Sequence, residues 1–182
     1  MKLARNVQDA TPLRLDRREI THLAGQLGVR HGIGAGQGVL EAFARLGGRY
    51  REVLSTFGLD DDRIVCRGPT EVEAVGEREA GCNLVLLGEA LAILLLHRPL
   101  AVSRHGSDVV LAVPRLTPDG DGFLVMREAL WFGTALVMPT EDFRTAHAGD
   151  PDPESIARRF GVSRRTAQGR ARSLGLAIPE PA

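Results

Sequence analysis

The residue whose type and setting most invite chemistry is Glu89, which stands inside an almost wholly apolar run. From Leu84 to Leu96 only Gly88 and Glu89 are not plainly apolar, and Leu and Ala dominate the composition. This composition predicts a buried helix rather than a strand. A carboxylate inside such a helix is costly unless it is paired or opens onto a cleft, so Glu89 is a candidate functional residue.

A second apolar helix is predicted from Phe123 to Met138, and it carries another carboxylate, Glu128. Together the two stretches resemble the ImmA/IrrE family of zinc metallopeptidases. That family's central helix reads His-Glu-x-x-His and then Leu-Leu-Leu-His, and the same frame here reads Gly88-Glu89-Ala90-Leu91-Ala92 and then Ile93 to His97. Its third metal ligand is a glutamate in Glu-Ala-Asn-x-Phe-Ala leading to Leu-Leu-Met-Pro, and this chain reads Glu128-Ala129-Leu130-Trp131-Phe132-Gly133 and then Leu136-Val137-Met138-Pro139.

The resemblance covers about residues 20 to 176 and implies a zincin-like frame that has lost its metal ligands. In the family, two imidazoles at positions i and i+4 of one helix face bind Zn²⁺, and the adjacent glutamate acts as general base on the bound water. Gly88 and Ala92 occupy the two histidine positions and offer no lone pair. We therefore expect no metal, no cofactor and no catalysis, with Gly88, Glu89, Ala92 and Glu128 as remnants of the site.

Two alternatives concern the same carboxylates. A rewired metal site would take its ligands from Glu89, His97, His105 and Glu128. Zinc sites rely on imidazole or thiolate ligands at tight spacing, and these histidines do not offer it. The structural alternative is that Glu89 pairs with an arginine, either Arg127 or Arg104, in what was once the cleft.

Residues 151–182 have the pattern of a helix-turn-helix unit, with six arginines against three carboxylates. Asp152 and Pro153 are typical of a helix start, Gly161 suits the turn, and Ser163 suits the cap of a second helix over about residues 164–174. The residues expected to contact DNA are Ser163, Arg164, Arg165, Gln168, Arg170 and Arg172. The alternatives are a protein-docking role and a purely structural one.

The rest of the pattern predicts an α+β fold in which a small sheet packs on long helices. We expect a helix from Arg18 to Gly28, an undecided helix or strand over residues 39–46, and a helix that starts at a capping box formed by Thr70 and Glu73. Pro99 is expected to end the helix that carries Glu89. Strands are expected over residues 50–57, 63–67, 100–103 and 109–113, and surface loops over residues 31–38 and 58–62.

Composition and charge exclude several classes of function. The chain has 182 residues and a formal net charge of zero, so no overall field draws it to nucleic acid or membrane. Cys66 and Cys82 make neither a disulfide framework nor a four-ligand zinc site, and they should pack as small apolar residues. The apolar run before Pro99 is too short to span a membrane, and the N-terminus has no apolar signal region, so we expect a cytoplasmic protein.

The expected organisation is a loose N-terminal lead-in (residues 1–18), a pseudo-peptidase domain (19–150) and a helix-turn-helix tail (151–182). By resemblance, the partner is a repressor or another transcription factor, which the protein would bind without cutting it, while the tail contacts DNA or helps to dock the partner. The rival functions are an active metallopeptidase with rewired ligands and a DNA-binding transcription factor whose front domain senses a ligand.

Overall fold

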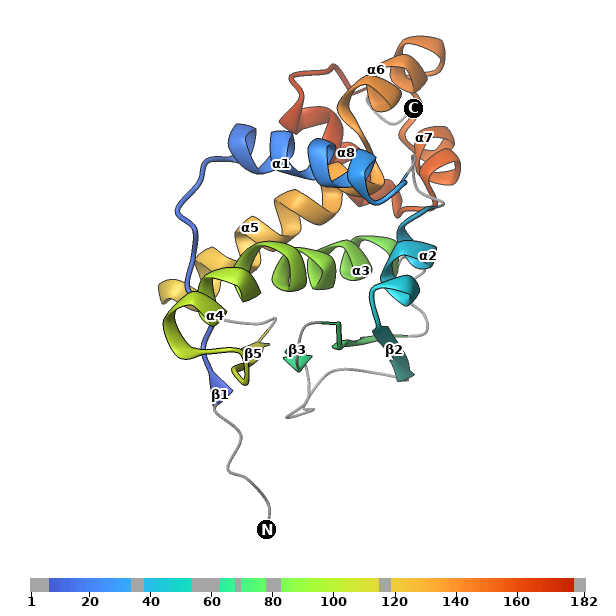
Figure 1. Ribbon diagram of the computed structural model, residues 1–182. Coiled ribbons are helices and arrows are strands. Elements are labelled where there is room, and N and C mark those ends of the chain that lie inside the picture. Colours follow the sequence, from blue (N-terminus) through green and yellow to red (C-terminus); the bar gives the residue numbers. More distant parts are fainter. Residues whose placement is uncertain are drawn as a thin grey trace.

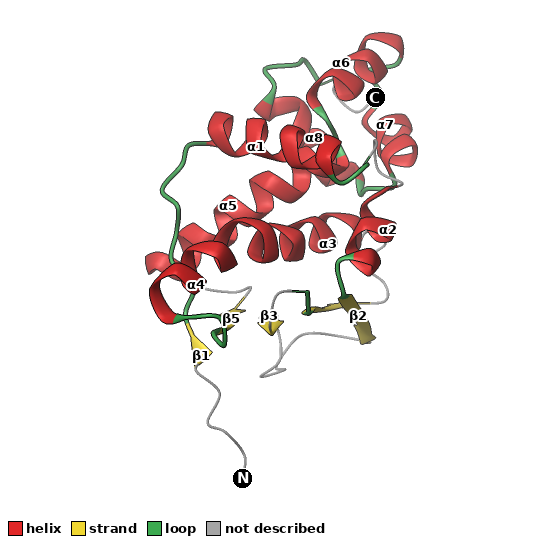
Figure 2. Ribbon diagram, in the orientation of Figure 1, coloured by secondary structure: helices red, strands yellow, loops and turns green. Residues whose placement is uncertain are grey.

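A computed structural model of the chain describes residues 7–33, 38–53, 63–67, 70–77, 83–114 and 119–178 (Figures 1 and 2). The fold is α+β, as predicted. Its strands are β1 (Val7–Gln8), β2 (Gly48–Val53), β3 (Arg63–Arg67), β4 (Val72–Glu77) and β5 (Val110–Pro114). Its helices are α1 (Arg17–Arg30), α2 (Gly38–Arg45), α3 (Asn83–Ala92), the π-helix η2 (Ile93–His97), α4 (Arg98–His105), α5 (Gly120–Val137), α6 (Thr140–Gly149), α7 (Pro153–Phe160) and α8 (Arg164–Ser173).

The strands form one mixed sheet in the order β1-β5-β3-β4-β2. β1 is parallel to β5 and β2 is parallel to β4, whereas β3 runs antiparallel to both of its neighbours. Buried and half-buried residues alternate along β3 and over Val72–Ala74 of β4, with Ile64 and Cys66 buried and Arg67 and Glu73 half-buried. The sheet therefore has one core-facing side, and Figure 1 shows the helices gathered on it.

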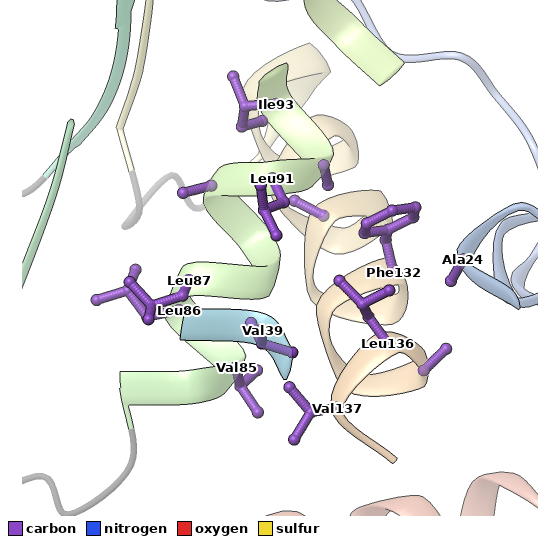
Figure 3. Packing of buried hydrophobic residues seen from close by; sticks show 14 of the residues in the cluster. Ala24, Val39, Val85, Leu86, Leu87, Leu91, Ile93, Phe132, Leu136 and Val137 are labelled. Atoms are coloured by element: carbon purple, nitrogen blue, oxygen red, sulfur yellow. The ribbon is translucent and has the colours of Figure 1, made fainter. Parts of the chain in front are cut away.

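The helices stack in layers above that side of the sheet. α3 contacts both β4 and α5, and α5 in turn contacts α1. Figure 3 shows Phe132 and Leu136 of α5 directed between α3 and Ala24 of α1. All three side chains are buried. The predicted pair of long apolar helices is thus the centre of the core.

The helix that carries Glu89 does not end at Pro99, contrary to prediction. Inside an α-helix a proline lacks the N–H and collides with the carbonyl four residues earlier. Here η2 precedes it, and the N–H of Arg98 bonds to the carbonyl of Ile93, five residues back. Pro99 then lies in the first turn of α4, where a missing N–H is tolerated.

The resulting helical run from Leu84 to His105 is long and apolar enough to cross a membrane by length and composition. The expectation that the run is too short depended on a stop at Pro99. In the fold, 67% of its most apolar window is buried. It lies between the sheet and α5, as the core helix of a globular domain does.

Two other predicted elements were wrong. Thr70 and Glu73 do not cap a helix, because residues 72–77 form β4. Val72 and Ala74 are buried against the helices, and Glu73 pairs across the outer face with Arg67 at 2.7 Å. Residues 100–103 belong to α4 and are not a strand, since the π-helical segment carries the helix past Pro99.

The remaining elements agree with the sequence where the structure describes them. β3 and β5 match the predicted strands at residues 63–67 and 109–113, and residues 39–46 resolve as the helix α2. Cys66 is fully buried, and burial raises the pKa of its thiol to about 11, which fits a packing role. Cys82, the loop residues 34–37 and the turn at residues 58–62 lie outside the described residues.

The described part of the predicted N-terminal lead-in, from Val7 onward, packs on the rest of the chain. From Val7 it adds an edge strand to the sheet, parallel to β5. Ala10 is buried, and Asp16 caps α1 with a full capping box in which Glu19 bonds back to the N–H of Asp16. The stretch between them crosses the end of the core beside α5, where it meets Glu128.

The C-terminal residues pack onto the same core. α7 ends at Gly161, which adopts the left-handed conformation (φ 64°), and Ser163 caps α8 by accepting the N–H of Thr166. Phe160 stacks on Phe143 of α6 with ring centroids 5.7 Å apart. One hydrophobic cluster thus extends across the predicted domain boundary at residue 151.

Candidate functional site

Gly88 of α3, which by resemblance corresponds to a metal ligand, packs against the neighbouring helix. α3 and α5 cross where Gly88 faces Gly133, and a Cβ placed on Gly88 would lie 2.6 Å from the Cα of Gly133. A Cβ on Gly133 would lie 2.8 Å from the backbone nitrogen of Glu89. No side chain fits at either position without separating the helices, so an imidazole at residue 88 is excluded by the packing as well as by the sequence.

Glu128, which by resemblance corresponds to the family's third ligand, accepts a hydrogen bond on each of its oxygens. Its two carboxylate oxygens accept backbone N–H groups from the N-terminal segment, that of Leu13 at 2.9 Å and that of Arg14 at 2.6 Å. Arg14 has a positive φ of 61°, an uncommon conformation for a residue other than glycine, and its side chain pairs with Asp121 at 3.2 Å. The N-terminal segment therefore uses the carboxylate as its anchor.

His97 stands beside Glu128 in the same buried position. Its Nδ1 lies 3.1 Å from the carbonyl of Thr11, and because a carbonyl only accepts, Nδ1 must carry the proton. Its Nε2 lies 3.7 Å from Oε2 of Glu128. Burial lowers the pKa of His97, against the opposing effects of the Thr11 hydrogen bond and of the Glu128 charge. The imidazole is therefore neutral at pH 7.

The other two remnant positions are also enclosed. Ala92 is fully buried, and Glu89 is 7% exposed. The predicted arginine partners of Glu89 are engaged elsewhere: Arg127 lies over the ring of Trp131, and Arg104 donates to the hydroxyl of Thr11. The pairing of Glu89 with either arginine stays a prediction.

The donor set does not fit zinc, the metal that the resemblance implies. Gly88 and Ala92 offer no ligand atom, and both oxygens of Glu128 accept backbone N–H groups. In the part of the chain that the structure describes, no three side chains of His, Cys, Asp or Glu come together as metal ligands. Within the rewired set of Glu89, His97, His105 and Glu128, the side chains of His97 and Glu128 lie close together, with Nε2 3.7 Å from Oε2.

The residues predicted to contact DNA separate into two groups. Ser163, Arg164, Arg165 and Arg172 are exposed on α8 or at its start, and Gln168 is half-buried. Arg170 is 3% exposed, and it donates to the carbonyl of Met138 at 3.0 Å and to the hydroxyl of Thr140 at 3.1 Å. The assignment of Arg170 to a phosphate contact is therefore corrected, because its guanidinium joins α8 to the end of α5.

With this geometry described, the comparisons with known proteins can be placed on it. Residues 120–172 match the family model of the IrrE N-terminal-like domain, peptidase M78. The match begins with α5, which carries Glu128, and extends through most of α8, so it supports the resemblance for the third-ligand helix and the tail. It does not include Gly88 or Ala92. No curated protein matches the chain.

Several residues that shape the site gave little or no signal in the sequence. The N–H groups of Leu13 and Arg14 are backbone atoms, which every residue except proline has. Gly133 is a weak signal, because a glycine in each of two apolar helices is compatible with a close crossing but does not show that the two meet. A cavity of about 980 Å³ lies between α1 and the start of α6, and its lining does not include Gly88, Glu89, Ala92 or Glu128.

Proposed function

We propose that this protein is a non-catalytic regulator of the ImmA/IrrE type, which binds a repressor or another transcription factor and contacts DNA through α7 and α8. The observation that carries the first part is the engagement of Glu128 by the backbone of residues 13 and 14. A carboxylate in this state is a structural anchor. The same frame that positions a catalytic zinc in peptidases here positions the chain's own N-terminal segment.

The loss of catalysis follows from three features together. A zinc peptidase needs imidazoles on one helix face and an open position for water. Residue 88 is a glycine in backbone contact with α5, residue 92 is a buried alanine, and residues 11–14 lie over Glu128 and His97. A protein partner that used the former cleft would have to displace this segment, so we expect its dissociation to be linked to exposure of residues 11–14.

The DNA-binding part rests on the exposed arginines of α8. Arg164, Arg165 and Arg172 project from a helix whose opposite face is held by buried Ala167 and Ala171. A helix that is fixed on one face and basic on the other is what major-groove binding requires. Since the protein has no net charge, attraction to phosphate would come from this surface alone.

The test is equilibrium binding of labelled DNA duplexes by fluorescence anisotropy at several salt concentrations. We expect binding that weakens steeply with salt and that falls roughly tenfold in Arg164→Ala, because each base or phosphate contact is worth about 1–3 kcal/mol. Arg30→Ala, an exposed arginine at the end of α1, is the matched control. Equal losses in both variants, or no binding by the wild type to a pool of random duplexes, would contradict the DNA-binding part.

Capture of the partner is tested separately. The protein should retain a repressor encoded near it without cutting it, as seen by co-purification and intact mass of both chains. Cleavage of the repressor that is lost in Glu89→Gln would contradict the non-catalytic proposal and favour a peptidase with other ligands.

A further inference from the structure

A second cavity, of about 290 Å³, lies where α8 meets α1 and α5. Its size is at the lower end of the range of about 300–1,000 Å³ that ligand pockets occupy. Arg17 of α1, Trp131 of α5, and Arg165 and Arg170 of α8 line it. The walls therefore combine one aromatic ring with three guanidinium groups from two elements far apart in the sequence.

Arg170 is the unusual member of this set. A buried arginine is normally paired with a carboxylate, because an isolated charge is costly to remove from water. Arg170 is 3% exposed, yet among the described residues its hydrogen bonds go to two neutral oxygens, the carbonyl of Met138 and the hydroxyl of Thr140. Burial, followed by the charges of Arg17 and Arg144, lowers its pKa to about 10, so it stays a cation at neutral pH.

The other two arginines add to this uncompensated charge. Neither Arg17 nor Arg165 forms an ion pair with a carboxylate among the described residues, and no aspartate or glutamate of the described chain lines the cavity. Arg17 lies over the ring of Trp131, 5.1 Å from its centroid, and Arg127 lies over the same ring at 4.9 Å. Like charges that converge on one hollow repel one another unless an anion occupies it.

We propose that this cavity binds a small doubly charged oxyanion, either inorganic phosphate or the phosphate group of a small phosphomonoester. Guanidinium groups bind phosphate oxygens with paired, charge-assisted hydrogen bonds. The hydroxyl groups of Thr21 and Thr134 also line the cavity and can donate to the remaining oxygens, whereas that of Ser173 already donates to the carbonyl of Arg170 at 2.7 Å. A single carboxylate would compensate one charge of three, so phosphate is the better match.

Because the cavity lies between α8 and the core helices, a bound phosphate would affect the position of α8. It would tie α8, the exposed basic helix, to α1 and α5 of the core. Binding would then fix the orientation of Arg165, which lines the cavity and also belongs to the predicted DNA surface. This link to DNA rests on the proposed function, whereas the binding of phosphate does not.

The binding test uses the intact protein and inorganic phosphate. Trp131 is the only tryptophan in the chain and lines the cavity, so its fluorescence reports occupancy directly, with calorimetry as a second readout. We expect saturable binding and a rise in the melting temperature with phosphate concentration. Arg165→Gln should weaken phosphate binding by about tenfold or more. Arg159→Gln, an exposed arginine of α7 outside the cavity, should leave the affinity within about twofold.

Each other outcome has a definite meaning. A phosphomonoester such as glycerol phosphate that binds at least tenfold more tightly than phosphate identifies the source as an organic phosphate, and equal affinity identifies the free ion. No saturable binding of either, or equal weakening in Arg165→Gln and Arg159→Gln, overturns the proposal. Arg17→Gln is the second variant, since it removes the cation supplied by α1. No DNA is present in these titrations, so a lack of phosphate binding would not contradict the DNA-binding proposal. Likewise, a lack of DNA binding would not contradict the phosphate proposal.

Discussion

At the scale of single residues, the account depends on Glu128 as the anchor of the N-terminal segment. Glu128→Gln keeps the shape and removes one acceptor oxygen, so the N–H of either Leu13 or Arg14 would face an amide donor. A buried donor left without an acceptor costs about 1–3 kcal/mol. We expect the free energy of unfolding in urea to fall by that amount, and the amide hydrogens of both residues to exchange faster.

Glu41→Gln is the control for this change, because Glu41 lies exposed on α2. It should alter the free energy of unfolding by less than about 0.5 kcal/mol. If Glu128→Gln were equally neutral, the anchoring role would be refuted.

His97 makes stability depend on pH. Because burial lowers its pKa in the folded protein below the ordinary value of about 6.5, the unfolded chain takes up the proton first as the pH falls. The contribution of the neutral imidazole is fully present above about pH 6.5 and is lost as the pH falls toward the folded pKa. Urea unfolding at pH 7.5 and at pH 5.5 should show this loss in the wild type.

His97→Asn preserves a donor for the carbonyl of Thr11 and has no titrating group. It should therefore lose less stability than the wild type between the two pH values. His22→Asn, which replaces an exposed imidazole, should follow the wild type. A pH dependence that is the same in all three proteins would show that His97 does not cause it.

At the scale of elements, the close crossing of α3 and α5 leaves no room for a side chain at residue 88. Gly88→Ala places a Cβ against the backbone of Gly133, and overpacking of this kind typically costs about 1–3 kcal/mol. Gly25→Ala on the exposed face of α1 meets nothing within 4 Å and should stabilise the helix by roughly 0.5–1 kcal/mol. Thermal unfolding of the two variants should move in opposite directions.

The helices that the sequence predicts well are the ones with strong local signals. The apolar stretch from Phe123 to Met138, followed by Pro139, is predicted as a helix, and the structure gives α5 over nearly the same range. Two predictions fail. At Pro99 a π-helical turn lets the helix continue past the proline, and after Thr70 the chain forms the strand β4 and not a capped helix. The π-helical turn and the pairing of β4 both depend on the tertiary fold, so the residues next to Pro99 and Thr70 were not enough to predict them.

In the candidate site, too, the sequence predicts some residues, and others are found only in the structure. Glu89 and Glu128 stand out in the sequence because carboxylates are rare in apolar helices. The backbone N–H groups that engage Glu128 lie more than a hundred residues away, and the buried state of Arg170 depends on how α8 packs on α5. Such pairings follow from the tertiary fold, so only a structure could show them.

At the scale of the whole molecule, the tail is part of the core. Removing residues 151–182 would expose Phe143, which stacks on Phe160. It would also remove the hydrogen bond that Arg170 donates to the carbonyl of Met138. We expect a chain ending at Asp150 to bind a hydrophobic dye and to lose its cooperative melting transition. A chain ending at Ile178 is the control and should melt as the wild type does. A cooperative, soluble fragment 1–150 would instead establish two independent domains.

In the function we propose, the N-terminal segment occupies the place that a metal takes in zinc peptidases of the resembled family. The most direct test is the zinc content per chain, by elemental analysis of protein purified without a chelator or a His-tag and dialysed against zinc. The account predicts a content near zero, unchanged in Glu128→Gln. A content close to one zinc per chain that falls in Glu128→Gln would contradict it.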